Sequence, residues 1–144
     1  MNYKKWLIED LQNLDRWRFS IMQQQEELAT LEAEMTAIRA TNYDKLPGGG
    51  DIYQDRMLTA VAKKDELTAN LALTRKRVED LDRLLSELPD DERRIVEQMY
   101  VHRERHAVDS LAEELGFDSS HIYRLKNQAL VHLATLRHGS GFQT

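Results

Sequence analysis

The chain has 144 residues, enough for one or two small domains, and carries a formal net charge of -5 at pH 7. It contains no cysteine, which excludes disulfide bonds and thiolate chemistry and is compatible with a reducing cytoplasm. No apolar run reaches membrane-span length, and Lys4 and Lys5 lead into an amphipathic pattern unlike a signal peptide. The acidity argues against indiscriminate binding to nucleic acid. It permits binding through one basic face, because salt screens charges beyond about 8 Å.

The first element is a long helix predicted over residues 2–39, in a chain whose composition favours long helices and an all-α fold. Apolar residues recur at every seventh position and at neighbouring positions, as in a coiled-coil seam: Leu7, Leu14, Ile21, Leu28 and Met35, with Leu11, Trp17, Leu31 and Ile38. Gln24 and Gln25 interrupt this seam. Trp6 and Trp17 fit either a core or a contact patch, and we favour the core.

Residues 40–51 break the pattern, because they contain one proline, three consecutive glycines and no periodicity. They predict a flexible reversal, and no Gly-Lys-Ser/Thr sequence follows that would indicate a phosphate-binding loop. A second long helix is predicted over residues 52–87 from a second apolar seam: Met57, Ala60, Leu67, Leu71, Val78, Leu81, Leu85 and Leu88. The two helices predict an antiparallel, coiled-coil-like hairpin over residues 1–87. Since a hairpin buries only one stripe of each helix, we expect a homodimer through it.

Residues 88–138 are predicted to form a second domain of three helices. Pro89 and the three acidic residues after it are typical of a helix start, and this helix continues to Tyr100 or Val101. A charged turn over residues 102–106 follows. The core is predicted to contain Ile95, Met99, Val108, Leu111, Ala112, Leu115, Ile122, Leu125, Ala129 and Leu133. Residues 139–144 are expected to form a flexible tail.

Residues 111–125 have the spacing of a helix, a tight turn and a second helix. Gly116 stands where the first helix must end in a left-handed conformation, and Asp118 can cap the second helix. Phe117 is expected to fill the turn. The second helix then has one apolar face, which we expect to be buried: Ile122, Leu125, Ala129, Leu133 and Leu136. This pattern predicts a DNA-binding helix-turn-helix motif.

The second helix of the motif has polar side chains pointing away from its apolar face: Ser119, Ser120, Tyr123, Arg124 and Asn127. Such side chains can reach base edges and phosphates. From Ser119 to the last residue the sequence contains no Asp or Glu, whereas it contains Arg124, Lys126, Arg137 and three histidines. This favours DNA, because a carboxylate facing phosphate would repel it. The alternative is that the acids simply cluster near other helix starts, where the helix dipole stabilises them.

Residues 88–136 resemble region four of bacterial sigma factors. The matching pieces are Leu88-Pro89, Glu92-Arg93-Arg94-Ile95-Val96, Tyr100, Ala112-Glu113-Glu114-Leu115-Gly116 and Ala129-Leu130. Together with the N-terminal hairpin and the Pro-Gly loop, the whole chain resembles phage-encoded transcriptional regulators of the ArpU and RinA type. Two positions depart from the pattern. Ala107-Val108 stands where the family often has an aromatic residue, and Asp118 replaces the more usual serine cap.

The resemblance implies a sequence-specific DNA-binding transcriptional regulator of phage or prophage late genes, in the cytoplasm of a bacterial host. Its implied partners are double-stranded DNA and, as for sigma region four, RNA polymerase; no cofactor is expected. Five side chains fall where the recognition helix enters the major groove: Ser119, Ser120, Tyr123, Arg124 and Asn127. Arg124 would bind guanine and Asn127 adenine, each through two hydrogen bonds. Phosphate contacts are expected from Lys126, Arg103 and Arg105.

Catalysis has little support in the sequence, and we do not expect an enzyme. His102 and His106 are four residues apart, but they flank the predicted turn and no third metal ligand accompanies them. No Ser–His–Asp set or pair of carboxylates stands out. The alternative function is that of a helical interaction or assembly factor, either an RNA polymerase adaptor or a subunit like the small terminase. In small terminases the DNA-binding unit typically comes first in the chain, so the order found here disfavours that assignment.

Overall fold

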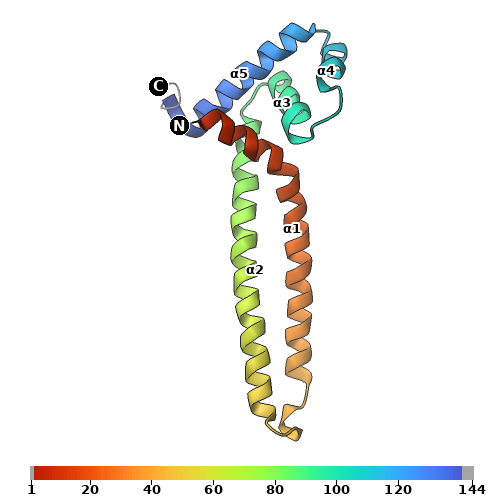
Figure 1. Cartoon of the computed structure of the whole chain (residues 1–144), viewed down its shortest axis with the longest axis vertical. Coiled ribbons are helices and arrows are strands. Elements are labelled where there is room, and N and C mark those ends of the chain that lie inside the picture. Colours follow the sequence, from red (N-terminus) through yellow and green to blue (C-terminus); the bar gives the residue numbers. More distant parts are fainter. Residues whose placement is uncertain (1, 141–144) are drawn as a thin grey trace. The chain divides into compact units, whose positions relative to one another are not determined.

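The computed structural model describes residues 2–140, and every regular element within that range is a helix. The elements are α1 (Tyr3–Ala40), the 3₁₀ helix η1 (Tyr43–Lys45), α2 (Gly49–Ser86), α3 (Asp90–Val96), the π-helical turn η2 (Glu97–Val101), α4 (Ala107–Leu115) and α5 (Ser119–His138) (Figure 1). The predicted all-α class is confirmed for these residues. None of the described helices is long and apolar enough to cross a membrane. Of the predicted tail, residues 141–144 lie outside the described range.

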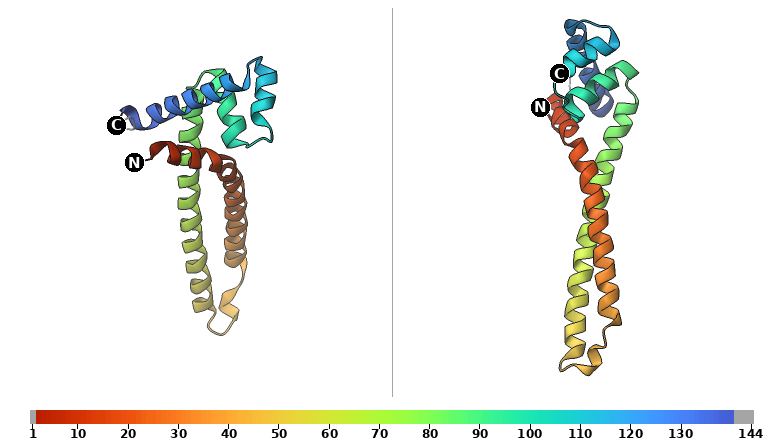
Figure 2. Two further views of the ribbon diagram at one scale, coloured as in Figure 1. Left: turned by 45° about the horizontal axis from the view of Figure 1, so that its top comes forward. Right: turned by 90° about the vertical axis from the view of Figure 1, so that its right-hand side faces the viewer.

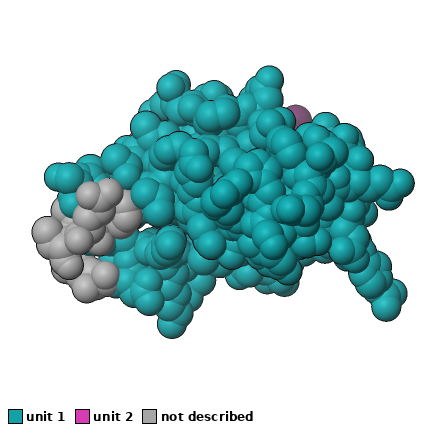
Figure 3. Space-filling view, turned by 90° about the horizontal axis from the view of Figure 1, so that it is seen from above, with its two compact units in different colours: residues 1–17, 77–144 teal, residues 18–76 magenta. Residues whose placement is uncertain are grey.

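The chain forms two compact units that divide both long helices. Unit 1 contains residues 1–17 and 77–144, and unit 2 contains residues 18–76; unit 1 is teal in Figure 3. The sequence places the boundary between its two domains at residues 87–88 instead. The structure moves this boundary, because the first turns of α1 and the last turns of α2 pack with the C-terminal helices.

Unit 2 is an antiparallel pairing of α1 and α2, as Figures 1 and 2 show. Its buried side chains occupy the predicted seam: Leu31, Met35, Ile38, Ala60 and Leu71. At a polar point of the seam, the Gln24 Nε2 atom lies 3.4 Å from the Thr74 hydroxyl oxygen. At another, the Lys64 Nζ atom is 3.7 Å from a Glu32 carboxylate oxygen. The predicted hairpin is therefore confirmed, with polar pairs where the apolar pattern is interrupted.

The reversal between α1 and α2 is shorter and more regular than the predicted loop over residues 40–51. It contains η1, and α2 already begins at Gly49. Tyr43 is buried there; its hydroxyl accepts a hydrogen bond of 2.6 Å from Arg56 Nη1, and its ring meets Tyr53 edge-on. A Cβ atom on Gly49 would stand 1.5 Å from the Tyr43 carbonyl oxygen. The sequence shows the glycines but does not reveal this close approach. It therefore predicts that the second helix begins at residue 52, whereas α2 begins at Gly49.

In unit 1, α3 and α4 both pack against α5, the longest of the three C-terminal helices. One cluster of buried side chains joins them: Ile95, Ala107, Leu111 and Ile122. Partly buried side chains surround this cluster, and all ten predicted core residues are buried or half-buried. The arrangement of three helices that the sequence predicts is present.

Two predictions of burial are wrong. Leu136 is 50% exposed, because the buried arc of α5 runs from Ala129 to Leu130 and Ala134 and leaves Leu136 beyond its edge. Trp6 is 47% exposed and meets Tyr3 edge-on. Trp17 is half-buried, with the Arg77 guanidinium carbon 5.5 Å from its ring centroid.

The first turns of α1 supply part of the interior of unit 1. Leu7, Leu11 and Leu14 are completely buried. Polar contacts reinforce them: Arg137 forms an ion pair with Asp10, His102 Nδ1 lies 2.7 Å from Asp15 Oδ2, and the rings of Tyr3 and His138 stack with centroids 4.4 Å apart. The apolar residues of α1 therefore pack against two different sets of helices. Its first part packs with the C-terminal helices and its remainder with α2.

Candidate nucleic-acid interface

The predicted helix-turn-helix is formed by α4, α5 and the three residues between them. Gly116 ends α4 in the left-handed conformation (φ 72°, ψ 28°) that glycine adopts without strain. The backbone N–H groups of Gly116 and Phe117 both donate to the Ala112 carbonyl oxygen. The Asp118 carboxylate accepts a 2.8 Å hydrogen bond from the His121 backbone N–H and so caps α5. These bonds fix the direction in which α5 leaves the turn.

The inner side of the motif is held by packing and by one ion pair. Ile122 on α5 and Leu111 on α4 are completely buried, and Phe117 in the turn packs partly buried against their cluster. On the neighbouring helix, Arg94 forms an ion pair with Glu114 of α4. The start of α5 is therefore packed against a rigid core. A binding surface needs such support if its side chains are to keep a defined geometry.

The five side chains predicted to reach bases lie on the exposed side of the first turns of α5: Ser119, Ser120, Tyr123, Arg124 and Asn127. Tyr123 remains 48% exposed although it is aromatic. Arg124 directs its guanidinium to His121 Nδ1, within hydrogen-bonding contact. The buried Ile122 faces the opposite way, so the structure brings the five together on one face.

The three candidate phosphate-binding residues are placed differently from one another. Lys126 is half-buried, and its Nζ atom lies 5.7 Å from the Tyr123 ring centroid, at the edge of the exposed face. Arg103 and Arg105 are exposed in the turn between η2 and α4. Arg103 has a positive φ of 50°, and the Glu104 backbone N–H donates to the Gln98 carbonyl oxygen at 2.9 Å. These two arginines belong to a defined turn rather than to α5.

A recess connects this turn to the start of α5. Glu104, Asp109, Ser119 and Tyr123 all contribute to its lining. The sequence does not indicate that the carboxylates of Glu104 and Asp109 lie near the start of α5, because these residues precede the acid-free stretch by at least ten residues. Carboxylates repel phosphate. A phosphate group at this recess would therefore be repelled by Glu104 and Asp109.

His121 is a further member of the face that sequence reasoning did not single out. Its ring stands edge-on against Phe117, with centroids 4.4 Å apart, and its Nδ1 atom faces Arg124. Phe117, Ser120, His121 and Arg124 line a second shallow recess. The spacing of three between His121 and Arg124 was the available signal, because residues three apart on a helix are neighbours.

The basic character of the last helix is smaller than the sequence suggests. Arg137 is paired with Asp10, and His132 Nδ1 lies 2.8 Å from Glu92 Oε2, which is on a carboxylate that is only 3% exposed. Both side chains therefore take part in contacts within unit 1. The positive charge beside the exposed face of α5 comes from Arg124 and Lys126.

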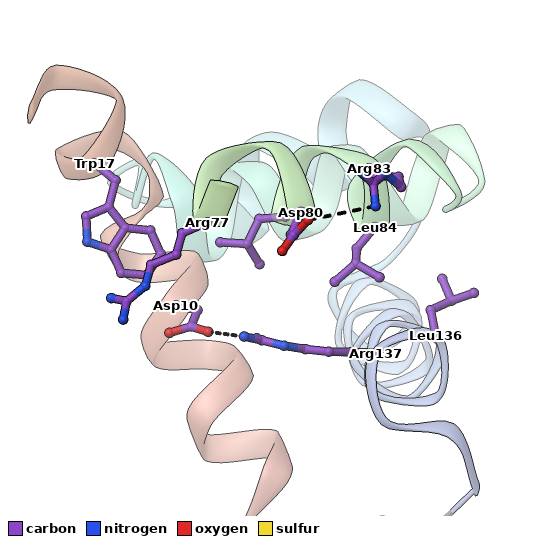
Figure 4. Close-up of a pocket in the computed structure, with 9 residues that line it drawn as sticks. Asp10, Trp17, Arg77, Asp80, Arg83, Leu84, Leu136 and Arg137 are labelled. Atoms are coloured by element: carbon purple, nitrogen blue, oxygen red, sulfur yellow. Dashed lines mark hydrogen bonds and ion pairs between the residues drawn. The ribbon is translucent and has the colours of Figure 1, made fainter. Parts of the chain in front are cut away.

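The described part of unit 1 has three further features that bear on possible chemistry. A groove between α1, α2 and α5 contains Trp17, Arg77 and Leu84, with Arg137 held by Asp10 and Arg83 within 3.8 Å of Asp80 (Figure 4). Burial raises the pKa of the Tyr100 phenol above its ordinary value. Within residues 2–140, no three His, Cys, Asp or Glu side chains lie close enough together to hold a metal ion.

Comparisons with known proteins do not assign this arrangement. The chain matches no protein-family model, no curated protein and no solved structure.

Proposed function

We propose that this protein is a sequence-specific DNA-binding transcriptional regulator, of the kind that controls late genes of a phage or prophage. The observation that carries the proposal is the start of α5. A capped helix follows a left-handed glycine turn, its inner side is fixed by Ile122, and its outer side exposes Ser119, Tyr123, Arg124 and Asn127. This is the construction of a recognition helix that enters the major groove.

In the proposed complex, bases and phosphates are bound by different residues. Arg124 donates two hydrogen bonds to guanine, and Asn127 binds adenine through its amide. Ser119 and Ser120, at the start of α5, meet a phosphate, where the helix dipole favours an anion. Further phosphate contacts come from Lys126 and from the arginines of the preceding turn, Arg103 and Arg105.

The proposal includes a homodimer, because two recognition helices related by a twofold axis would bind two half-sites. RNA polymerase is a second candidate partner, on the basis of the resemblance to sigma region four. The exposed apolar side chains of the hairpin favour the alternative of a protein-interaction factor, and they include Phe19, Met22 and Leu58. The experiment on DNA separates these functions.

The test begins with selection of duplexes from a random library by the full chain, followed by fluorescence anisotropy on the selected site at two salt concentrations. Arg124→Ala should weaken specific binding by a factor of about 5–150, corresponding to about 1–3 kcal/mol, and relax the preference at one base pair. Lys126→Ala should weaken binding to all sequences evenly and reduce the salt slope by about one phosphate. Arg75→Ala, which removes an exposed arginine of unit 2, is the matched control and should bind as the wild type does.

Two results would contradict the proposal. Equal binding of the selected site by Arg124→Ala, Lys126→Ala and the wild type would show that the face is assigned to the wrong residues. Failure of the wild type to enrich any sequence would move the function to a protein partner.

A further inference from the structure

The contact between Arg124 and His121 determines where the proton of the imidazole lies. The guanidinium nitrogen Nη2 of Arg124 is within hydrogen-bonding contact of Nδ1 of His121. An arginine side chain has only N–H donors and stays charged in proteins, so Nδ1 must accept the hydrogen bond. The contact therefore requires a neutral imidazole that carries its proton on Nε2.

His121 is itself held in place from two sides. Its ring meets the Phe117 ring edge-on, with centroids 4.4 Å apart, and Phe117 packs against the buried cluster that contains Ile122. Its backbone N–H donates the 2.8 Å hydrogen bond to the Asp118 carboxylate. A continuous series of contacts thus leads from the core of unit 1 through Phe117 and His121 to the guanidinium of Arg124.

The acceptor that orients Arg124 is an imidazole and not a carboxylate. A carboxylate would neutralise the charge of the guanidinium and would repel phosphate. Asp118 also lines this recess, but its carboxylate accepts the hydrogen bond that caps α5. A neutral imidazole orients Arg124 and leaves its positive charge available to DNA. Because the guanidinium has five N–H groups in a planar fork, the hydrogen bond to Nδ1 leaves donors for the two acceptors of guanine.

We propose that His121 is a positioning residue for base recognition, which holds the guanidinium of Arg124 in one orientation before DNA binds. This inference rests on the proposed function, in which Arg124 binds guanine. A side chain with many rotamers loses conformational freedom when it is fixed on a base, and that loss weakens binding. A guanidinium that is already fixed in the free protein has less freedom to lose. His121 thereby strengthens discrimination at the base pair bound by Arg124.

Two substitutions separate the hydrogen-bond acceptor from the ring. His121→Phe keeps an aromatic ring against Phe117 and removes Nδ1, whereas His121→Asn replaces the ring by an amide whose oxygen can accept from Arg124. Anisotropy gives the base preference as a ratio of dissociation constants, for the selected duplex and for one changed at the base pair where Arg124→Ala relaxes the preference. We expect His121→Phe to reduce this ratio by a factor of about 2–12, and His121→Asn to retain most of it.

The control is the same substitution in the absence of the guanidinium. In the Arg124→Ala background, His121→Phe should leave the ratio unchanged, because the group that His121 positions is gone. Circular dichroism should show the same helix content for every variant. Two results would overturn the inference and leave the proposed function standing. One is an equal loss of affinity for all duplexes, and the other is an unchanged ratio for His121→Phe where Arg124→Ala relaxes the preference.

A second measurement needs no DNA. Nitrogen NMR spectra of the isotope-labelled full chain, in mildly alkaline buffer, report which nitrogen of each imidazole carries the proton. His132 on the same helix is the matched reference, because its Nδ1 lies 2.8 Å from a Glu92 carboxylate oxygen and must donate. We expect the proton on Nε2 in His121 and on Nδ1 in His132. Arg124→Ala should shift the Nδ1 signal of His121 and leave that of His132 in place.

These spectra distinguish failure of the inference from failure of the proposed function. A proton on Nδ1 of His121, or an Nδ1 signal that Arg124→Ala leaves unchanged, would overturn the inference whatever the duplexes show. If the spectra agree but the wild type enriches no duplex, the proposed function is refuted, and the role of His121 in base recognition is refuted with it.

Discussion

The two units of this protein bury their side chains to different extents. Every large side chain that is less than 2% exposed belongs to unit 1: Leu7, Leu11, Leu14, Ile95, Leu111, Ile122, Leu133 and Val96. In unit 2 the buried seam residues keep a few per cent of their surface, such as 5% for Leu31 and 6% for Leu71. The difference follows from geometry, because two paired helices can cover only one stripe of each other.

The difference in burial determines which unit can hold a surface in a fixed geometry. Unit 1 has several helices around one interior, so the start of α5 is held from behind by side chains that water does not reach. Unit 2 is an extended pair whose outer residues remain open to a partner. The proposed recognition of DNA therefore belongs to unit 1, and the proposed self-association belongs to unit 2.

The largest expected effect comes from removing the N-terminal part of unit 1. A fragment of residues 88–140 lacks the three completely buried leucines of α1 and the partners of His102 and Arg137. We expect it to lose cooperative thermal unfolding, because its remaining core is too small and leaves exposed apolar surface. Circular dichroism and a proton–nitrogen correlation spectrum check this. A dispersed spectrum with cooperative unfolding would show that the C-terminal helices are an independent domain, as the sequence alone predicts.

The next comparison uses one substitution in each unit. Leu11→Ala should lower the free energy of unfolding by about 3 kcal/mol, because it leaves a cavity in a closed interior. Leu31→Ala should cost about 1–2 kcal/mol, because Leu31 lines two surface grooves that can relax or admit water. Urea unfolding of both variants provides the measurement. Equal losses would mean that the two interiors are equally closed.

The third comparison concerns two neighbouring glycines at the tip of unit 2, with an expected loss smaller than that of Leu11→Ala. Gly49→Ala should destabilise the hairpin by about 2 kcal/mol, because its Cβ atom would overlap the Tyr43 carbonyl oxygen. Gly50→Ala is the control next to it. It meets nothing within 4 Å and should be neutral or stabilising by about 0.5 kcal/mol in the first turn of a helix. Thermal unfolding distinguishes the two, and equal melting temperatures would exclude the close approach at Gly49.

The elements of this fold could be predicted from the sequence because local rules determine them. Heptad spacing located both long helices, and Gly116 with Asp118 located the turn of the helix-turn-helix to the residue. The division into units could not be predicted in this way. Leu7 and Leu14 continue the same heptad pattern as Leu31 and Met35, and nothing in that spacing tells which partner each leucine meets.

The residues of the candidate site could be predicted from the sequence, whereas the side chains that surround them could not. The exposure of Ser119, Arg124 and Asn127 follows from helix periodicity once Ile122 is buried. The position of Glu104 beside Ser119 and the pairing of Arg137 with Asp10 depend on tertiary contacts between residues distant in sequence. Counting charges along the chain therefore overestimated the positive field of α5.

The most direct test is a titration of the isotope-labelled full chain with its selected duplex, followed by backbone amide shifts in both units. We predict that amides of residues 119–127 and of the turn over residues 102–106 shift in proportion to bound DNA, while those of residues 18–76 keep their positions. A scrambled duplex at the same salt should shift the turn more than the start of α5, since only phosphate contacts remain. Shifts confined to residues 18–76, or none in the presence of any duplex, would contradict the assignment of α5 as a recognition helix.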